Sequence, residues 1–219
     1  MKNTWVLIPG CNEEKYLERV LKKVKKYTSN IVFVDDGSRD KTVKIAHKHL
    51  KHVLIHEVNL GKGAALKTGC EYLFKHLEAE HIVLMDADDQ HNPAELPLFF
   101  EALKEHDIVL GVRDLNTTMP GPRVFMNKLT SYFVKLLFGK YIPDIPSGYK
   151  AISKSSYDKV KWDTAEYGVE LEIAAKISKY DLPFAVVNIE TIYHDFARGM
   201  TAIDSLKLIN YLISLRIKL

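Results

Sequence analysis

Short apolar runs alternate with segments of helical periodicity through the first half of the chain, and this alternation predicts the fold. The apolar runs are typical of buried β-strands and fall at residues 5–9, 31–35, 53–56, 82–85 and 108–112. Between them, apolar residues recur three and four positions apart, as on one face of a helix, at 17–24, 66–77 and 96–103. Strands that alternate with helices favour an α/β fold with a mostly parallel central sheet covered on both faces.

The second half is predicted to continue this layered fold with longer helices. Helices are expected at 123–138, at 166–180 and from 201 to the end, with a returning strand at 147–153 and one or two strands at 184–194. A loop rich in proline and glycine, residues 113–122, precedes the first of these helices. Because no change in composition marks a boundary, residues 1–219 are predicted to form a single domain.

Composition and charge exclude several classes of protein. The hydrophobic fraction of 47% and the charged fraction of 27% are ordinary for a soluble globular domain. The net charge of +3 is too small to indicate nucleic-acid binding, and two cysteines are too few for a disulfide framework. There is no signal peptide, and no apolar run approaches the roughly 18 residues of a membrane-spanning helix. We therefore expect a cytoplasmic protein that can touch a membrane without crossing it.

The strongest chemical signal lies where the fourth predicted strand ends in Asp86-Ala87-Asp88-Asp89-Gln90. A buried strand that ends in two alternate carboxylates presents hard oxygen ligands at the carboxyl edge of the sheet. Such ligands suit Mg²⁺ or Mn²⁺ and, through the cation, a diphosphate substrate. Acidic residues after a strand also cap helices, so the pattern alone leaves a purely structural role open.

Two further loops at the same edge carry polar residues. The second strand ends in Asp35-Asp36-Gly37-Ser38, where Asp36 can accept hydrogen bonds from a base or a ribose, and Ser38 can cap a helix. Lys62, between two glycines at the start of a helix, can attract an anion. The glycine-rich signatures of dinucleotide oxidoreductases and of P-loop nucleotide hydrolases are both missing, which disfavours those classes.

Four motifs together resemble the series found in family 2 glycosyltransferases. They are Pro9-x-x-Asn12-Glu13-Glu14, Asp35-Asp36-Gly37-Ser38-x-Asp40-x-Thr42, Asn59-x-Gly61-Lys62-Gly63-Ala64-Ala65 and Asp86-Ala87-Asp88-x-Gln90-His91-x-Pro93-x-Glu95. Their order and spacing are most similar to the branch of dolichyl-phosphate mannose synthases and polyprenyl-phosphate glycosyltransferases, over roughly residues 4–200. The resemblance implies a GT-A fold, a Rossmann-like α/β sandwich. It also implies a nucleotide-sugar half at 1–112, an acceptor half at 113–200 and an amphipathic C-terminal helix at 201–219.

The resemblance also assigns the donor site. The base and ribose are expected against Pro9, Cys11, Glu13, Val34 and Asp36, and the ribose and diphosphate against Asp86 and Ala87. Asp88 and Gln90 are expected to hold a divalent cation, Mg²⁺ or Mn²⁺. Arg198 and Lys207 are expected to help bind the leaving diphosphate, and Asp88 and Arg198 to be the catalytic residues. Cys11 stands where the family often has an aromatic residue, so recognition of the base is expected to differ here.

The acceptor half contains the cations that a phosphate acceptor needs. Arg113 and Arg123 resemble arginines that grip the acceptor phosphate or the donor diphosphate in the lipid-phosphate branch. Asn127, one helical turn after Arg123, stands where serine is common in that branch and is expected to contact the acceptor phosphate too. Ser147-Gly148-Tyr149-Lys150-Ala151 is similar to another segment of that branch. The Gln-x-x-Arg-Trp signature of polysaccharide-making members is missing. Glu170 or Glu172 could replace their catalytic base, but a helix-dipole or surface role at the helix start is favoured for both.

These features predict inverting transfer of mannose or glucose from a nucleoside diphosphate, such as GDP-mannose or UDP-glucose, to a polyprenyl phosphate. Transfer to a saccharide or glycolipid hydroxyl, and a nucleotide-sugar-binding module without transfer activity, are the alternatives. The segment 205–219 is apolar with a narrow polar stripe, which suits a helix in a membrane interface or one packed on the domain. The helix at 124–138 can join it, so we expect peripheral contact with the cytoplasmic face of the membrane and no contact with nucleic acid.

Overall fold

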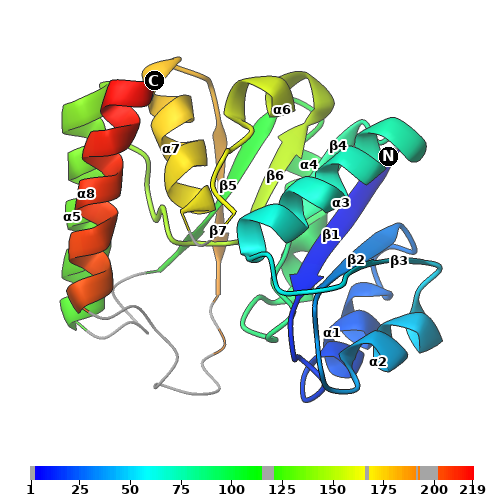
Figure 1. Ribbon diagram of the computed structural model, residues 1–219. Helices are drawn as coiled ribbons and strands as arrows, with labels where there is room; N and C mark the ends of the chain where they lie inside the picture. Colours follow the sequence, from blue (N-terminus) through cyan, green and yellow to red (C-terminus); the bar gives the residue numbers. More distant parts are fainter. Residues whose placement is uncertain (1–2, 115–120, 166–167, 191, 193–201) are drawn as a thin grey trace.

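Strands of the described chain form one seven-stranded sheet in the order β3-β2-β1-β4-β6-β5-β7 (Figure 1). The computed structural model describes residues 3–114, 121–165, 168–190, 192 and 202–219, without the side chains of residues 122, 123 and 202–209. The strands are β1 (Thr4–Gly10), β2 (Ile31–Asp36), β3 (His52–His56), β4 (His81–Leu84), β5 (Ile108–Arg113), β6 (Lys150–Ser153) and β7 (Ala185–Ile189). All neighbouring pairs are parallel except those of β6, which is antiparallel to both β4 and β5. The predicted α/β fold with a mostly parallel sheet is confirmed.

Helices cover both faces of this sheet. They are α1 (Leu17–Val24), α2 (Thr42–His49), α3 (Lys62–His76), α4 (Leu96–Ala102), α5 (Gly121–Phe138), α6 (Lys154–Val160), α7 (Val169–Lys179) and α8 (Ala202–Lys218), with a short 3₁₀ helix η1 (Pro93–Glu95) before α4. One buried cluster joins one face of the sheet to α3 and α7, and a second joins the opposite face to α1 and α4. Successive β1 residues alternate between the two clusters, with Leu7 in the first and Val6 and Ile8 in the second, as expected for a strand buried on both faces.

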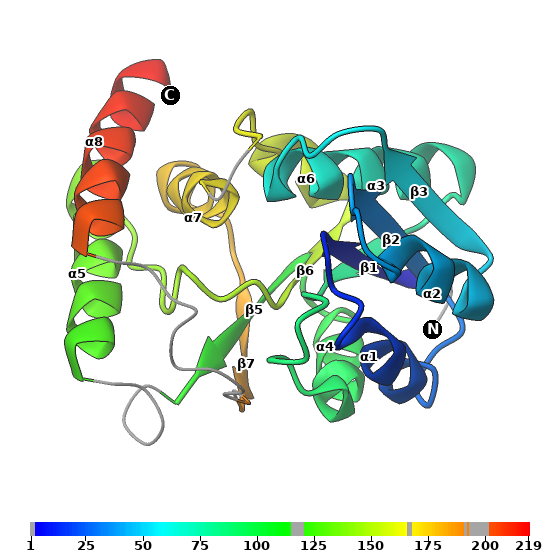
Figure 2. The same ribbon diagram turned by 60° about the horizontal axis from the view of Figure 1, so that its bottom comes forward.

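Helices α5 and α8, together with α7, extend the first cluster outward from the sheet. In Figures 1 and 2, α5 and α8 lie side by side at the edge of the molecule, with α7 between them and the sheet. Leu212 and Leu215 on α8 are buried in the same cluster as Val134 and Phe138 on α5. The C-terminal helix therefore packs on the domain along one face, as one of the two sequence interpretations expected. No helix in the described ranges has the length and apolarity needed to cross a membrane.

Some predicted boundaries differ from the structure. The strand expected at 147–153 begins at Lys150, because a turn precedes it in which the Ser147 N–H donates to the Asp144 backbone oxygen at 3.0 Å. The short helix α6 was not predicted; Ser153 caps it by accepting a hydrogen bond from the Ser156 N–H at 3.1 Å. The last predicted strand, 184–194, is observed only as β7, and residues 193 and 194 lie outside the described chain.

Candidate active site

The carboxyl ends of β1, β2, β4 and β5 and the start of antiparallel β6 lie at one edge of the sheet. In open α/β sheets, ligands bind outside this edge. Most of the residues singled out from the sequence follow these strand ends. The fold therefore brings together groups that are more than 100 residues apart in the chain.

The acidic corner after β4 keeps two oxygen-bearing side chains partly exposed. The Asp88 carboxylate accepts a hydrogen bond from the Gln90 N–H at 3.0 Å, and both side chains are partly open to solvent. Asp89 has a φ of 61° and turns the other way, where its buried carboxylate pairs with Arg19 Nε at 2.7 Å and Lys23 Nζ at 2.8 Å on α1. These two ion pairs anchor the loop to α1 and leave Asp88 and Gln90 on the outer side.

The chemistry of this corner fits a hard dication. Asp88 offers a carboxylate and Gln90 an amide oxygen, and Mg²⁺ and Mn²⁺ prefer oxygen ligands. No group of three His, Cys, Asp or Glu side chains in the described ranges is arranged to hold a metal by itself. Mg²⁺ is usually bound through one or two carboxylates together with substrate phosphates, so the corner matches a site that the substrate completes.

Asp86 is part of a partly buried ion-pair network rather than a free ligand. Lys62 Nζ lies 2.8 Å from Asp86 Oδ1 and 2.8 Å from Glu170 Oε1. Burial alone would raise the pKa of Asp86, but the ammonium of Lys62, through its charge and its hydrogen bond, outweighs burial and lowers that pKa to about 2. Gly148 lies directly against the Asp86 carboxylate, since a Cβ there would collide with Oδ2. Lys62 thus binds two carboxylates of the site, which the sequence did not predict.

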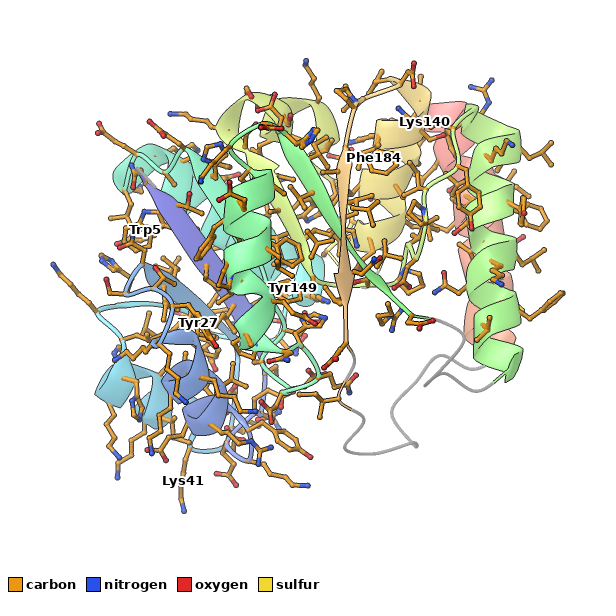
Figure 3. The ribbon with its side chains drawn as sticks, turned by 180° about the vertical axis from the view of Figure 1, so that it is seen from behind. Trp5, Tyr27, Lys41, Lys140, Tyr149 and Phe184 are labelled. Carbon is orange, nitrogen blue, oxygen red and sulfur yellow. The ribbon has the colours of Figure 1, made fainter. Side chains whose placement is uncertain are left out.

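His91 contacts the acidic corner through the backbone of Asp86. Its Nδ1 accepts a hydrogen bond from the Asp86 N–H at 3.1 Å, and its ring stacks on Tyr149 with centroids 4.9 Å apart. Burial lowers the pKa of His91 to about 4, so the ring is neutral and Nδ1 is able to accept. Tyr149 also stacks on Phe99 of α4 at 4.2 Å, and Figure 3 shows Tyr149 beside this helix.

The expected nucleotide site is a hollow of about 360 Å³ that opens between the ends of β1, β2 and β3. Cys11 and Asn12, residues 37–39 and residues 57–59 line it. Cys11 accepts a hydrogen bond from the Asn59 amide at 3.2 Å, so a thiol and an amide occupy the wall where an aromatic residue is common in the family. Pro9 and Val34 are buried beneath this loop cluster.

Asp36 lies beside the hollow but is bonded to the chain itself. Its carboxylate accepts hydrogen bonds from the Leu60 N–H at 2.9 Å and the Gly61 N–H at 2.8 Å, and it pairs with His56 Nδ1 at 2.8 Å. The side chain is nearly fully buried. These contacts order the loop that leads into α3, and contact with a ribose or base stays a prediction.

Two of the predicted acceptor residues meet on a carboxylate that the sequence analysis missed. Arg113 donates to Asp144 from its backbone N at 2.9 Å, from Nε at 2.8 Å and from Nη2 at 2.6 Å. Asn127 Nδ2 donates to the same carboxylate at 2.6 Å. Burial would raise the pKa of Asp144, but the hydrogen bonds from Arg113 lower it below its usual range. The side chains of Arg123 and Lys207, and all of Arg198, lie outside the described part of the chain.

The two candidates for a catalytic base have different surroundings. Glu172 is buried, and its carboxylate accepts from the N–H groups of Asp163 at 2.9 Å and Thr164 at 2.8 Å and from the Tyr211 hydroxyl. It therefore ties the loop before α7 to α8. Glu170, paired with Lys62, lies beside Asp86 within the site.

Lys150 and Asp144 were missed as functional candidates. Lys150 is 3% exposed, and its Nζ donates to the backbone oxygens of Ile145, at 3.2 Å, and Ser147. A charged residue that opens an otherwise apolar strand was the available signal for Lys150. Asp144, in a Pro-Asp-Ile-Pro segment, looks like an ordinary turn residue, and only the fold brings it to Arg113.

Comparison with known proteins agrees with this geometry. The family model described as glycosyl transferase family 2 matches residues 5–161. An uncharacterized protein of Methanocaldococcus jannaschii is 34% identical over 97% of this chain and 92% of its own length. The UDP-N-acetylglucosamine–dolichyl-phosphate N-acetylglucosaminyltransferase of Methanococcus voltae is 30% identical over 98% of this chain and 96% of its length.

A solved structure supports the fold. Glucosyl-3-phosphoglycerate synthase from Mycobacterium tuberculosis, in complex with Mn²⁺, UDP-glucose and phosphoglyceric acid, superposes with a TM-score of 0.75 at 21% identity, over 98% of this chain and 79% of that one. The GT-A expectation is confirmed by this likeness. The chain is a glycosyltransferase and belongs to glycosyl transferase family 2.

Proposed function

We propose that this enzyme transfers a hexose, mannose or glucose, from a nucleoside diphosphate to a polyprenyl phosphate, with inversion at the anomeric carbon. The observation that carries the proposal is that both carboxylates that could act as a base are already engaged by other groups of the protein. Glu172 is bonded to backbone N–H groups, and Glu170 is paired with Lys62. A hydroxyl acceptor needs a base to remove its proton, whereas a phosphate acceptor is already an anion. The relative from Methanococcus voltae, whose name includes dolichyl phosphate, supports the same acceptor class.

The donor side follows from the acidic corner. Asp88 and Gln90 are the residues that would hold Mg²⁺ or Mn²⁺, and the cation would neutralise charge on the leaving diphosphate. Arg198 and Lys207 are proposed to assist there. Asp86 and Ala87 are proposed to lie against the ribose and diphosphate, and Pro9, Cys11, Glu13, Val34 and Asp36 against the nucleoside. Both GDP-mannose and UDP-glucose remain candidate donors.

The acceptor side is proposed to lie around Arg113, Arg123 and Asn127. Arg113 and Asn127 come from β5 and α5, and the structure holds both on Asp144. A guanidinium next to an amide provides several N–H donors in a fixed arrangement, which suits a phosphate group. Arg123, one turn before Asn127 on α5, would add a second cation.

A polyprenyl acceptor requires contact with a membrane, and α5 offers a suitable face. Phe125, Tyr132 and Leu136 are 65%, 60% and 79% exposed, and they recur seven and four positions apart with exposed Lys128 and Lys135 between them. In Figure 3, α5 lies at the outer edge of the molecule with side chains pointing away from the sheet. Apolar side chains with a cationic edge suit the interface of an anionic membrane. We propose peripheral binding at the cytoplasmic face.

The proposal is tested with purified enzyme, Mn²⁺, each nucleotide sugar and a short polyprenyl phosphate. The wild type is expected to form a sugar–phosphate–lipid product of inverted configuration. Asp88→Ala should abolish turnover while the circular dichroism spectrum stays unchanged. Substantial activity in Asp88→Ala, or no lipid product with any donor, would contradict the proposal.

Transfer to a hydroxyl is the second candidate, because Glu170 lies in the site beside Asp86 and Lys62. In that case Glu170 acts as the base after release from Lys62. Glu170→Gln would then reduce turnover by about 10²-fold or more with a soluble sugar acceptor. Full activity of Glu170→Gln on polyprenyl phosphate would decide for the phosphate acceptor.

A further inference from the structure

The segment of residues 144–148 consists of the turn from Asp144 to Ser147 and the following Gly148, and is here called the 144–148 turn. It contacts both sides of the site. At one end, the Asp144 carboxylate binds the guanidinium of Arg113 and the amide of Asn127 at 2.6–2.9 Å. At the other end, Gly148 lies against the Asp86 carboxylate, and a Cβ on Gly148 would come within 3.1 Å of Lys62 Nζ. Only three residues separate the acceptor-side contact of Asp144 from the donor-side contact of Gly148.

Lys150 fastens this turn to the sheet. Lys150 is the first residue of β6 and is in register with Leu84 of β4 and with Leu110 of β5, the strands that lead to the two sides. Its Nζ donates to the backbone oxygens of Ile145 and Ser147 within the turn. The side chain therefore reaches from a rigid strand into the turn and holds two of its carbonyl groups.

Charged groups from both sides of the site surround Lys150. Asp144 and Glu170 favour its ammonium form, while Lys62 and Arg113 oppose it, and each side supplies one carboxylate and one cation. Burial is the largest influence and lowers the pKa of Lys150 to about 8. Keeping a buried ammonium costs stability, so its retention is better explained by a role at the site.

We propose that the 144–148 turn sets the donor and acceptor sides at a fixed distance, with Asp144 and Lys150 as positioning residues for the transfer reaction. The inference rests on the proposed function for which side binds which substrate. Asp144 orients the donors of Arg113 and Asn127 toward the acceptor, and Gly148 lets the turn pass over Asp86. Lys150 keeps these two contacts in one rigid arrangement, so in-line attack occurs without a search for the correct geometry.

One buried polar group of the turn has no partner. Ser147 is 2% exposed, and its hydroxyl has no hydrogen-bond partner within the described ranges. A buried polar group without a partner costs free energy, so such groups often mark a place where water or a ligand binds. The hydroxyl is therefore available to an oxygen of a bound substrate.

The first test separates the two ends of the turn. Asp144→Asn keeps the shape of the side chain but removes its charge and leaves one accepting oxygen for four N–H donors, so the KM for the acceptor should rise about tenfold or more. The KM for the donor should change by less than about twofold. Gly148→Ala places a methyl group against Asp86 and should do the reverse, raising the donor KM about tenfold with little change in the acceptor KM.

The second test addresses Lys150. Lys150→Met removes the ammonium group that holds the turn, so kcat should fall about tenfold or more and the KM values for donor and acceptor should both rise. Lys150→Arg keeps the charge and should restore much of kcat. Asp158→Asn and Lys159→Met, on the exposed surface of α6, are matched controls that should leave all three constants unchanged. Thermal unfolding of every variant separates these effects from loss of fold. If Asp144→Asn does not fold, Arg113→Lys tests the same contact.

Equal effects of Asp144→Asn and Gly148→Ala on both KM values would overturn the inference, as would a fully active Lys150→Met. The failure of the proposed function looks different. If the wild type transfers sugar to another acceptor, the polyprenyl phosphate assignment is wrong. The donor KM and acceptor KM of Asp144→Asn and Gly148→Ala, measured with that acceptor, then decide the inference. If the wild type transfers nothing, calorimetry of UDP or GDP with Mn²⁺ decides it, since only Gly148→Ala and Lys150→Met should weaken nucleotide binding.

Discussion

At the scale of single residues, Glu95 connects the acidic corner to the chain that follows β7. Its Oε1 accepts a hydrogen bond from the Glu190 N–H at 2.6 Å, and the carboxyl group is buried. Nearby, the Ile192 N–H donates to the Gln90 backbone oxygen at 3.0 Å. These two hydrogen bonds hold Glu190 and Ile192 beside the proposed cation site. Glu95 belongs to the motif that follows Asp86, so its part in the motif is explained by this connection.

Burial raises the pKa of Glu95 to about 7 from its ordinary 4.5, and this predicts a pH-dependent stability. Between pH 4.5 and about pH 7, Glu95 holds a proton in the native state that the unfolded carboxyl has lost. The free energy of unfolding therefore falls as the pH rises through about 7. Glu95→Gln stays neutral and keeps the acceptor oxygen for Glu190. Its free energy of unfolding relative to the wild type should therefore increase by about 1–2 kcal/mol between pH 5 and pH 8, measured by urea denaturation.

The control for this prediction is Glu101→Gln, on the exposed side of α4, whose side chain is 71% exposed. The free energy of unfolding of Glu101→Gln should change with pH as that of the wild type does. Parallel curves for Glu95→Gln and the wild type would show that the Glu95 carboxyl is not protonated in the native state at neutral pH.

Residue chemistry in the sequence indicated where polar groups lie but not which way they face. The motif predicted the acidic corner, yet Asp88 and Asp89 are chemically identical, and only Arg19 and Lys23 on α1 decide that Asp89 turns inward. Likewise, the backbone N–H groups that occupy Asp36 come from a loop whose path depends on tertiary packing. Asp144 was missed because its partners lie 17 and 31 residues away in the sequence.

At the scale of elements, α5 has two faces with different roles. Asn127, Ser131 and Val134 are buried toward the domain, whereas Phe125 and Leu136 are exposed. The sequence predicted the helix itself, since its apolar residues recur at helical spacing, and it begins within two residues of the expected position. The sequence did not tell which apolar residues pack inside, because apolar residues lie on more than one side of the helix and the partner helices α7 and α8 decide the choice.

The exposed face of α5 predicts a measurable membrane affinity. Phe125→Ser and Leu136→Ser remove exposed apolar area without opening the core, so thermal stability should stay within about 1 °C. Binding to vesicles that contain anionic lipid should weaken by about tenfold or more for the double variant, because each buried side chain contributes about 1.5–3 kcal/mol. Co-sedimentation with vesicles measures this. Leu98→Ser on α4, where Leu98 is 53% exposed, is the matched control and should bind as the wild type does.

Unchanged vesicle binding in the double variant would assign the membrane contact to another surface. Binding that weakens with salt but not with the apolar changes would instead indicate the lysines of α5 as the main attraction.

At the scale of the whole molecule, the topology of the sheet explains why the site forms where it does. Parallel β1, β2 and β4 deliver the donor loops to one edge, and antiparallel β6 begins at that same edge between β4 and β5. Reversal of β6 is what puts Gly148 next to Asp86 and Asp144 next to Arg113. Strand alternation in the first half predicted the parallel part, but no local pattern predicts the neighbours of β6, since strand order depends on long-range pairing.

A donor that binds through a cation should stabilise the whole fold by mass action. At a hundredfold excess over its dissociation constant, the correct nucleotide sugar contributes about 2.7 kcal/mol, which corresponds to a rise in Tm of roughly 5–10 °C for a chain of this size. The rise should need Mn²⁺ or Mg²⁺ and disappear with EDTA. Asp88→Ala should lose the cation-dependent part, while Asp158→Asn on the exposed surface of α6 keeps all of it. Differential scanning fluorimetry with uridine and guanosine diphosphates measures these shifts and identifies the base that the hollow beside Cys11 accepts. A full cation-dependent shift in Asp88→Ala would place the cation elsewhere on the sheet edge, because a lost ligand must weaken the linked equilibrium.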